Sequence, residues 1–434
     1  MSKLPPSTNS LEVTSVANSA VQGQSDLKGG LIVAAALVAL VLKLAIAFNT
    51  FGSNDVVTFY EFGRALTEHG LEWTYQHSIL FNHPPLTALF LRAIYYLDHQ
   101  QFFRDNGLTF PFLLRLPGIV ADFVVVVAVL WLGKKDARFR LPIWALALFA
   151  LSPVSLMVSG FHGNTDPVMV MFLVLATVSA LRGNSVMCGL FFALSCQIKI
   201  VAVLLVPVFF FYWLARRRTI SFVVPFAIAS LILWAEPLIK FPTLFIKNVF
   251  SYGSFWGIWG ITYWLRLTAL PQFARVSFFN LLPVQNIIIN VLKVLIIAAV
   301  FVIAWRRRKL GERGLTDSIA CVWIVFFVFA PGACAQYMVW LAPFILILSP
   351  QFYLWLTVTS TLFLFFFYNI TAHGLPWYMA ISTNTLNTTW TPWTIWPWAV
   401  LAIGMVLLWL KAARATPSLR LFSLRTLDAE THEQ

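Results

Sequence analysis

Long apolar runs separated by short basic clusters recur along this chain, and they constrain its fold more than any other feature. Of its 434 residues, 59% are hydrophobic and 11% are charged, whereas soluble domains carry about 25% charged residues. A helix that crosses a bilayer needs about 20 mostly apolar residues, and about twelve segments meet that need. They lie near residues 30–48, 115–133, 141–158, 166–182, 185–198, 200–215, 219–238, 284–305, 316–333, 336–349, 352–369 and 393–411. We therefore expect an all-α polytopic membrane protein with about twelve transmembrane helices.

The basic clusters predict how these helices are oriented. They fall at residues 134–140, 182, 216–218 and 306–313 and in the C-terminal tail, all on one side of the expected spans. Cytoplasmic loops are enriched in lysine and arginine, so both termini are expected in the cytoplasm. The net charge of +13 then follows mostly from topology, and no nucleic-acid partner is expected.

The chain divides into three expected regions. Residues 1–29 form a polar lead rich in serine and threonine, which is expected to be disordered in the cytoplasm. Residues 30–411 form the transmembrane domain. Residues 412–434 form a cytoplasmic C-terminal tail.

Long segments of the transmembrane domain are expected on the outer face. They are residues 49–114, 239–283 and 370–392. In the first of them, the stretches 55–70 and 84–97 show apolar residues at helical spacing and are bounded by glycine or proline. We expect both stretches to be helices that lie on the membrane surface rather than cross it.

Titratable side chains are scarce in this chain, and they concentrate on the expected outer side. Six of the seven histidines fall there, namely His69, His77, His83, His99, His162 and His373. Ionisable groups gathered on one face of an apolar protein indicate that binding or chemistry takes place on that face.

Two carboxylates follow the first span closely. From its position alone, Asp55 is interpreted as the cap of the helix that begins after it, because aspartate accepts backbone N–H bonds well at that place. Glu61 lies six residues further on, on another face of the same expected helix. Only one of the two can then point into a given cavity.

A short outer turn and two cations are further candidates. The turn carries His162, Asn164 and Asp166, where Asp166 suits the start of the next helix and the group as a whole also suits a metal or a phosphate. Lys199 lies at the junction of two short helices, where it either extends to the interface or serves as a point charge for phosphate. Arg266 in the second outer segment has the same two interpretations.

Charged residues also occur inside the expected spans. Asp122 lies about two turns from Arg115, and Lys43 lies in the first span. Asp122 is interpreted as a structural partner of a neighbouring helix, because it lies deeper than a sugar or a peptide reaches.

Several function classes fit a polytopic membrane protein with ionisable groups on one face, and three of them are alternatives to a membrane transferase. A secondary transporter or lipid flippase also uses about twelve helices, but it predicts internal repeats with broken helices in corresponding halves, and no such pairing is visible. A membrane scaffold predicts that each outer acid is dispensable. A ligase that acts on lipid-linked glycans is a third alternative.

The order of the motifs resembles the polytopic GT-C glycosyltransferases, especially bacterial mannosyltransferases that use polyprenyl-phosphate mannose and relatives of the GPI mannosyltransferase. An acidic residue just after the first span opens the series. The motifs that follow are "FNHPPLTALFL" (81–91), "FLLRLPGIVADFVVVVAVLWLGKK" (112–135), "FHGNTDPVMVMFLVLA" (161–176), the junction at Lys199 and "CAQYMVWLAPFILIL" (334–348). The resemblance covers most of residues 30–350.

This resemblance implies transfer of mannose or a similar hexose from a polyprenyl- or dolichyl-phosphate donor, with inversion, on the non-cytoplasmic side. The partners it implies are the lipid-linked donor, membrane lipid and an acceptor that is a lipid, a glycan or a protein. The expected location is the bacterial inner membrane, or the endoplasmic reticulum membrane in a eukaryote.

The resemblance also assigns roles to individual residues. Asp55 matches the catalytic acid position in the first outer loop, so that the general-base interpretation replaces the cap, with Glu61 as second choice. The donor and its phosphate are expected to contact Lys199, Arg266, His162, Asn164 and Asp166. The acceptor or the loop is expected to contact His83, Gln336 and Tyr337. Some relatives carry a pair of aspartates where this chain has one, so no cofactor is expected and a divalent metal is the alternative.

Overall fold

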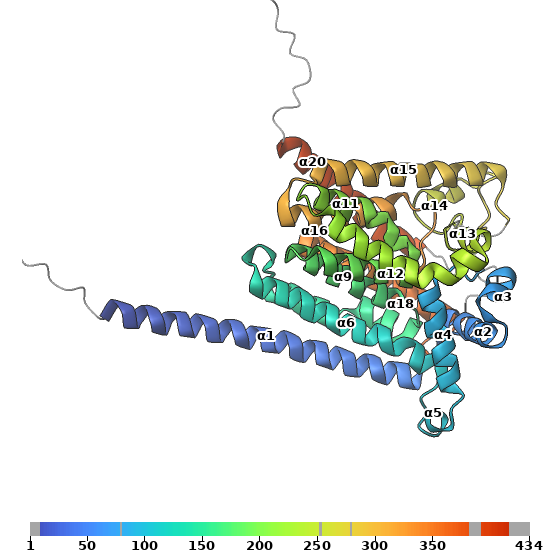
Figure 1. Cartoon of the computed structure of the whole chain (residues 1–434), viewed down its shortest axis with the longest axis horizontal. Helices are drawn as coiled ribbons and strands as arrows, with labels where there is room; N and C mark the ends of the chain where they lie inside the picture. The colour runs from blue at the N-terminus through green and yellow to red at the C-terminus, as the bar shows by residue number, and fades with distance from the viewer. Residues whose placement is uncertain (1–8, 79, 251–253, 278–279, 382–391, 416–434) are drawn as a thin grey trace, which may run out of the picture.

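The computed structural model describes residues 9–78, 80–250, 254–277, 280–381 and 392–415, with the side chains of 9–26 and 412–415 left aside (Figure 1). The fold is all-α, as expected. The described strands are two short pieces, β1 (Gly52–Ser53) and β2 (Met379–Ala380), which pair in parallel with Gly52 opposite Met379. The expected tail at 412–434 and the outer segment at 370–392 lie partly outside the described residues.

Seven helical segments in the described part of the chain are long and apolar enough to cross a membrane. Five of them are single helices: α1 (Asn9–Asn49, apolar from Leu27), α6 (Phe110–Lys135), α12 (Thr219–Lys240), α15 (Pro283–Arg307) and α18 (Pro350–Thr371). The sixth is a broken helix made of α7 (Ile143–Ala150), α8 (Pro153–Ser155) and η2 (Leu156–His162). The seventh combines η5 (Pro392–Thr394) with α20 (Ile395–Ala415). Figure 1 shows α1 along one edge of the bundle and α15 along the opposite edge.

Five of the expected spans are shorter or more polar, so the count of about twelve crossings stays a prediction. Four are short apolar segments: α9 (Asp166–Leu181), α10 (Ser185–Ile198), η3 (Ile200–Leu205) with α11 (Val206–Leu214), and η4 (Ala335–Val339) with α17 (Ala342–Leu348). The fifth, α16 (Gly311–Phe329), carries three charged residues in its first two turns. An α-helix rises about 1.5 Å per residue, so none of the four short segments spans the roughly 30 Å of a bilayer core.

The first helix begins earlier than the sequence predicts. Residues 9–28, which belong to the polar lead expected to be disordered, continue the first span as part of α1. Adding a turn to an existing helix costs less than starting a new one. The lead also contains a single glycine and no proline between Asn9 and Lys28, so little in it stops the helix.

The outer segments form helices with a core of their own. The segment between α1 and α6 holds α2 (Asn54–Glu68), α3 (Gly70–His77), α4 (Pro85–Asp98) and α5 (Gln101–Asp105), and the second outer segment holds α13 (Pro242–Phe250) and α14 (Gly260–Leu267). The helices expected at 55–70 and 84–97 are thus confirmed. They bury their apolar faces against each other and against α13, which contributes Phe245 to this core. Gly63 permits the close crossing, because a Cβ there would lie 2.9 Å from the Leu91 carbonyl oxygen.

The basic clusters meet at the end of the bundle opposite α2 to α5 (Figure 1). Arg138 in η1 (Ala137–Phe139) is 2.9 Å from Glu312 at the start of α16. Arg313 donates to the Arg138 carbonyl at 3.0 Å, and Arg218 donates to the Gly183 carbonyl at 2.7 Å. Loops far apart in sequence therefore share one end, as the positive-inside rule predicts for cytoplasmic loops.

Arg115 of α6 joins three segments beneath the outer helices. Its side chain is 1% exposed and donates to the carbonyl oxygens of Ala47 and Thr50 at the end of α1 and of Gly160 and Phe161 in η2. Within the described residues no carboxylate pairs with it. Carbonyls at the end of a helix carry partial negative charge, so they compensate the guanidinium and fix the ends of both segments.

A buried ion pair ties the same helices deeper in the bundle. Lys43 of α1 is 2.6 Å from the Asp122 carboxylate of α6 and 2.5 Å from the Ser155 hydroxyl. The interpretation of Asp122 as a structural partner of a neighbouring helix is confirmed. Satisfied buried pairs of this kind fix the register of helices more than they add stability.

We predict that Arg115→Met destabilises the protein strongly. The substitution leaves several buried carbonyl groups with fewer donors, which costs on the order of 3 kcal/mol. Thermal unfolding of the detergent-solubilised protein is expected to begin about 5 °C lower. The exposed Arg92→Met on α4 serves as the control, and an equal loss in both variants contradicts the role given to Arg115.

Candidate active site

The first turn of α2 places Asp55 just beyond the end of α1. Gly52 has a φ of +104°, and a Cβ there would lie 2.7 Å from the Phe161 carbonyl oxygen, so the chain turns tightly against η2 at a glycine. Ser53 is the residue that caps α2, because its hydroxyl accepts from the Asp55 N–H at 3.2 Å. The same hydroxyl donates to the His162 carbonyl at 2.8 Å. The interpretation of Asp55 as the cap is therefore wrong, since Ser53 caps α2 and the Asp55 carboxylate engages other groups.

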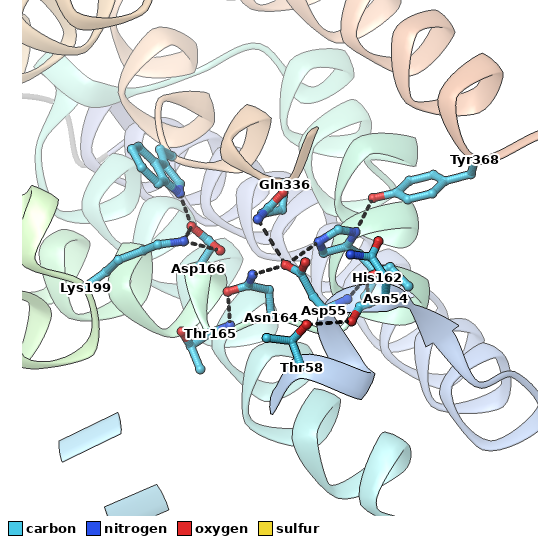
Figure 2. Close-up of polar contacts among 12 residues, drawn as sticks. Asn54, Asp55, Thr58, His162, Asn164, Thr165, Asp166, Lys199, Gln336 and Tyr368 are labelled. Atoms are coloured by element: carbon cyan, nitrogen blue, oxygen red, sulfur yellow. Dashed lines mark hydrogen bonds and ion pairs between the residues drawn. The ribbon is translucent and has the colours of Figure 1, made fainter. Parts of the chain in front are cut away.

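Three side chains converge on one oxygen of Asp55 (Figure 2). Oδ2 receives hydrogen bonds from Asn164 Nδ2 at 2.8 Å, His162 Nε2 at 3.1 Å and Gln336 Nε2 at 3.2 Å. Within the described residues Oδ1 receives none, and the side chain is 28% exposed. The carboxylate is thus held through one oxygen, while the other accepts no hydrogen bond from the described part of the chain.

Tyr368 of α18 orients the imidazole of His162. Its hydroxyl lies 2.9 Å from Nδ1 of the buried ring, and Figure 2 shows it on the side of the ring away from Asp55. A hydroxyl that donates to Nδ1 leaves the proton on Nε2, which then donates to Asp55. The π-helical segment η2 ends at His162, and such segments often aim a side chain at a functional site.

Asn164 is fixed by its own backbone. Its side-chain oxygen accepts from the Thr165 N–H at 2.6 Å, so the amide nitrogen must face Asp55. Gly163, with a φ of +83°, turns the chain between His162 and Asn164, and a Cβ there would lie 2.6 Å from a methyl carbon of Val56. The two donors therefore reach Asp55 because a glycine separates them.

The surroundings of Asp55 keep it ionised. Burial raises the pKa of this carboxyl, but the neighbouring His162, the hydrogen bonds from His162 and Asn164 and the charge of Lys199 together hold the pKa below its usual value of 3.8. The group therefore carries a negative charge throughout the neutral range.

A second charged pair lies beside the Asp55 cluster (Figure 2). Lys199 Nζ is 2.7 and 2.9 Å from the two oxygens of Asp166, which is fully buried and also accepts from the Trp340 indole. The ammonium lies 4.7 Å from the centre of the Tyr337 ring. Asp166 is thus not a simple helix cap, and Lys199 turns inward to its partner rather than out to the interface.

His83 lies in an aromatic surrounding near both charged groups. Its ring centre is 5.1 Å from that of Phe59 and 5.8 Å from that of Phe81, and the residue is 8% exposed. Burial, assisted by the charge of Lys199, lowers the pKa of His83 to about 3. The ring is therefore neutral and available as a hydrogen-bonding group rather than as a cation.

The structure does not bring every candidate to this place. Glu61 pairs with Arg64 on the exposed face of α2. Arg266 lies over the Tyr263 ring at 4.8 Å, and no hydrogen bond within the described residues joins it to the cluster around Asp55. Among the described residues, no group of three histidine, cysteine or acidic side chains has the arrangement of a metal site.

Sequence analysis missed Tyr368 and Trp340. Tyr368 stands in the aromatic run "FLFFFY", where only its hydroxyl distinguishes it from lipid-facing rings. Trp340 follows Gln336 by one helical turn, and this spacing is a signal that would have placed both on one face. Of the residues predicted to contact the acceptor or the loop, Gln336 donates to Asp55 and Tyr337 lies beside Lys199.

An ionised carboxylate with one oxygen left without a hydrogen bond by the described residues, next to a lysine and a neutral histidine, is suited to take a proton from a hydroxyl while an anionic group departs. Comparison of the sequence with known protein families points to the same kind of chemistry. Residues 82–257 match the model of the ALG6, ALG8 glycosyltransferase family. This range includes His83, His162, Asn164, Asp166 and Lys199, whereas Asp55, Gln336, Tyr337 and Tyr368 lie outside it.

No curated protein matches the chain. The family match, the membrane-spanning helices and the ordered motifs agree with one another. The chain is a polytopic membrane glycosyltransferase that takes a hexose from a lipid-linked donor, and over residues 82–257, less than half of its length, it is similar to the ALG6, ALG8 glycosyltransferase family.

Proposed function

We propose that the protein transfers a hexose from a polyprenyl- or dolichyl-phosphate donor to a hydroxyl of a glycan acceptor on the non-cytoplasmic side, with Asp55 as general base and inversion at the anomeric carbon. The observation that carries this proposal is the asymmetry of the Asp55 carboxylate. Three donors hold Oδ2, and no donor among the described residues is bonded to Oδ1.

The proposed reaction is a single displacement. Asp55 Oδ1 takes the proton of the acceptor hydroxyl, whose oxygen attacks the anomeric carbon from the face opposite the phosphate. The bond between the anomeric carbon and the phosphate oxygen breaks, and its electrons leave with the lipid phosphate. General-base assistance of this kind contributes about 10²–10⁴-fold.

Lys199 is the proposed contact of the departing phosphate. Its charge is one of the causes that lower the pKa of the Asp55 carboxyl, and its side chain is 14% exposed. Asp166 and the Tyr337 and Trp340 rings hold the ammonium in place. Since the lipid phosphate gains negative charge as the bond breaks, a fixed cation there stabilises the transition state.

Glucose is the favoured sugar. The resemblance in the sequence suggested mannose or a similar hexose, but the family whose model matches residues 82–257 comprises glucosyltransferases that depend on dolichyl-phosphate glucose. The same match favours a glycan as the acceptor. Glu61 is not carried forward as a base, because it lies in an exposed pair with Arg64.

We predict that Asp55→Asn abolishes transfer without unfolding the protein. Asparagine keeps the shape of the side chain but takes up no proton, so the rate is expected to fall at least about a hundredfold. The assay follows release of radiolabelled sugar from dolichyl-phosphate glucose and, separately, dolichyl-phosphate mannose, with extracted membrane glycans as acceptors.

Glu61→Gln is the matched control, because it removes a carboxylate from the same helix outside the cluster. Full activity in Asp55→Asn contradicts the role of the base. Transfer from the mannose donor alone contradicts the choice of glucose as the sugar, but it does not contradict the role of Asp55 as general base.

A second prediction concerns the dependence of kcat/KM on pH. Because the pKa of Asp55 is held below 3.8, the wild-type carboxylate stays ionised as the pH falls from 7 toward 5, and it causes no loss of rate there. Asn164→Leu removes a donor that favours the ionised form, so the pKa of Asp55 rises. The fall of kcat/KM on the acid side of the pH profile, which is the acid limb, therefore moves to higher pH. Thr58→Val, which removes only a hydroxyl bonded to the Asn54 carbonyl, is expected to leave the limb in place.

A third prediction tests the phosphate contact. Lys199→Gln is expected to lower kcat/KM for the donor about a hundredfold, whereas Lys240→Gln, which removes an exposed lysine at the outer end of α12, is expected to have no effect. The double variant Asp166→Asn with Lys199→Gln avoids an unpaired buried charge and is expected to fold and to show the same loss. Wild-type kinetics in the folded double variant contradict the role of Lys199.

A further inference from the structure

A cavity of about 430 Å³ opens at the basic end of the bundle, far from the candidate active site. It lies between the start of the apolar part of α1, the last turns of α6 and the start of α7. Its walls combine basic and apolar side chains. The lining residues are Lys28, Gly29, Ile32, Val129, Leu130, Gly133, Lys134, Phe139, Arg140, Leu141, Pro142, Ile143 and Leu146.

Three of these lining residues are cations, and they come from the middle of α1, the end of α6 and the loop between α6 and α7. Lys28 and Arg140 are exposed, and no carboxylate among the described residues pairs with either. The side chain of Lys134 lies against α1 at Gly29. A Cβ at that glycine would be 2.7 Å from the ammonium nitrogen of Lys134. A glycine in α1 therefore permits the ammonium of Lys134 to lie against that helix at the cavity.

The rest of the wall is apolar and belongs to membrane-spanning segments. Ile32 lies one turn into the bilayer from Lys28 on α1, and Ile143 and Leu146 belong to the first turn of α7. Basic residues thus stand at the membrane boundary, with hydrocarbon surface directly beside them. This combination fits a molecule with an anionic head and an apolar tail.

We propose that this cavity binds the headgroup of an anionic phospholipid from the leaflet at the basic end of the helices, which the positive-inside rule places in the cytoplasmic leaflet. The phosphate lies among Lys28, Lys134 and Arg140, and the acyl chains follow Ile32 and the start of α7. This lipid is a bound partner and not the sugar donor, because the candidate active site lies at the opposite ends of these helices.

Native mass spectrometry of the full chain in detergent tests the proposal, with phosphatidylglycerol as the probe and phosphatidylcholine for comparison. A specific phosphatidylglycerol adduct is expected in the wild type. The double variant Lys28→Gln with Arg140→Gln is expected to bind it about thirtyfold more weakly, since two basic residues at an anionic surface together contribute about 2 kcal/mol. The neighbouring Lys135→Gln, whose residue does not line the cavity, is expected to bind it as the wild type does.

Gly29→Leu tests the cavity without removing a charge. Its side chain displaces the flexible end of Lys134 and fills the space, so weaker phosphatidylglycerol binding is expected. Glycosyl transfer by each variant reports that the protein is folded. Undiminished binding in the double variant, equal losses in Lys135→Gln, or displacement of the lipid by millimolar inorganic phosphate alone each overturn the proposal.

Discussion

The guanidinium of Arg115 is the constraint on which the outer half of the molecule depends. It is buried without a carboxylate partner among the described residues, so its charge is compensated by carbonyl oxygens at the end of α1 and in η2. These two segments lead directly into Asp55 on one side and into His162 and Asn164 on the other. A charge that has no other partner must keep both ends together, and the hydrogen bonds to Asp55 follow from that arrangement.

Short helices determine how deep the site lies. Asp166 begins α9, Lys199 follows α10, and Gln336 lies in η4 at the start of another short apolar segment. Each of these segments is shorter than a bilayer core is thick, so the charged and polar groups of the site stand at the ends of short helices rather than of full spans. In the proposed reaction, these groups meet the phosphate of the lipid-linked donor.

Sequence patterns predict the parts of this site that depend on local order. Asp55 directly follows the first span, and the turn with His162, Asn164 and Asp166 joins two apolar helical segments, so local order alone puts both at helix ends, where the structure has them. The cap of α2 was not, because Ser53, Asn54 and Asp55 are all good caps. The choice among them depends on pairing of Gly52 and Ser53 with residues 379 and 380. The role of Tyr368 likewise depends on how α18 packs, which no local pattern records.

The hydrogen bonds to Asp55 constrain how a base of this kind works. Donors that lower the pKa of a carboxylate also weaken it as a base, so His162 and Asn164, which lower the pKa of Asp55, do not activate it. They orient it. With Oδ2 held by three donors, the direction of Oδ1 is fixed as well. In the proposed reaction, the proton transfers to Oδ1 once bond formation to the anomeric carbon has made the hydroxyl acidic, and departure of the phosphate beside Lys199 drives that step. On this proposal, the fold has to preserve the distance between the base and the cation.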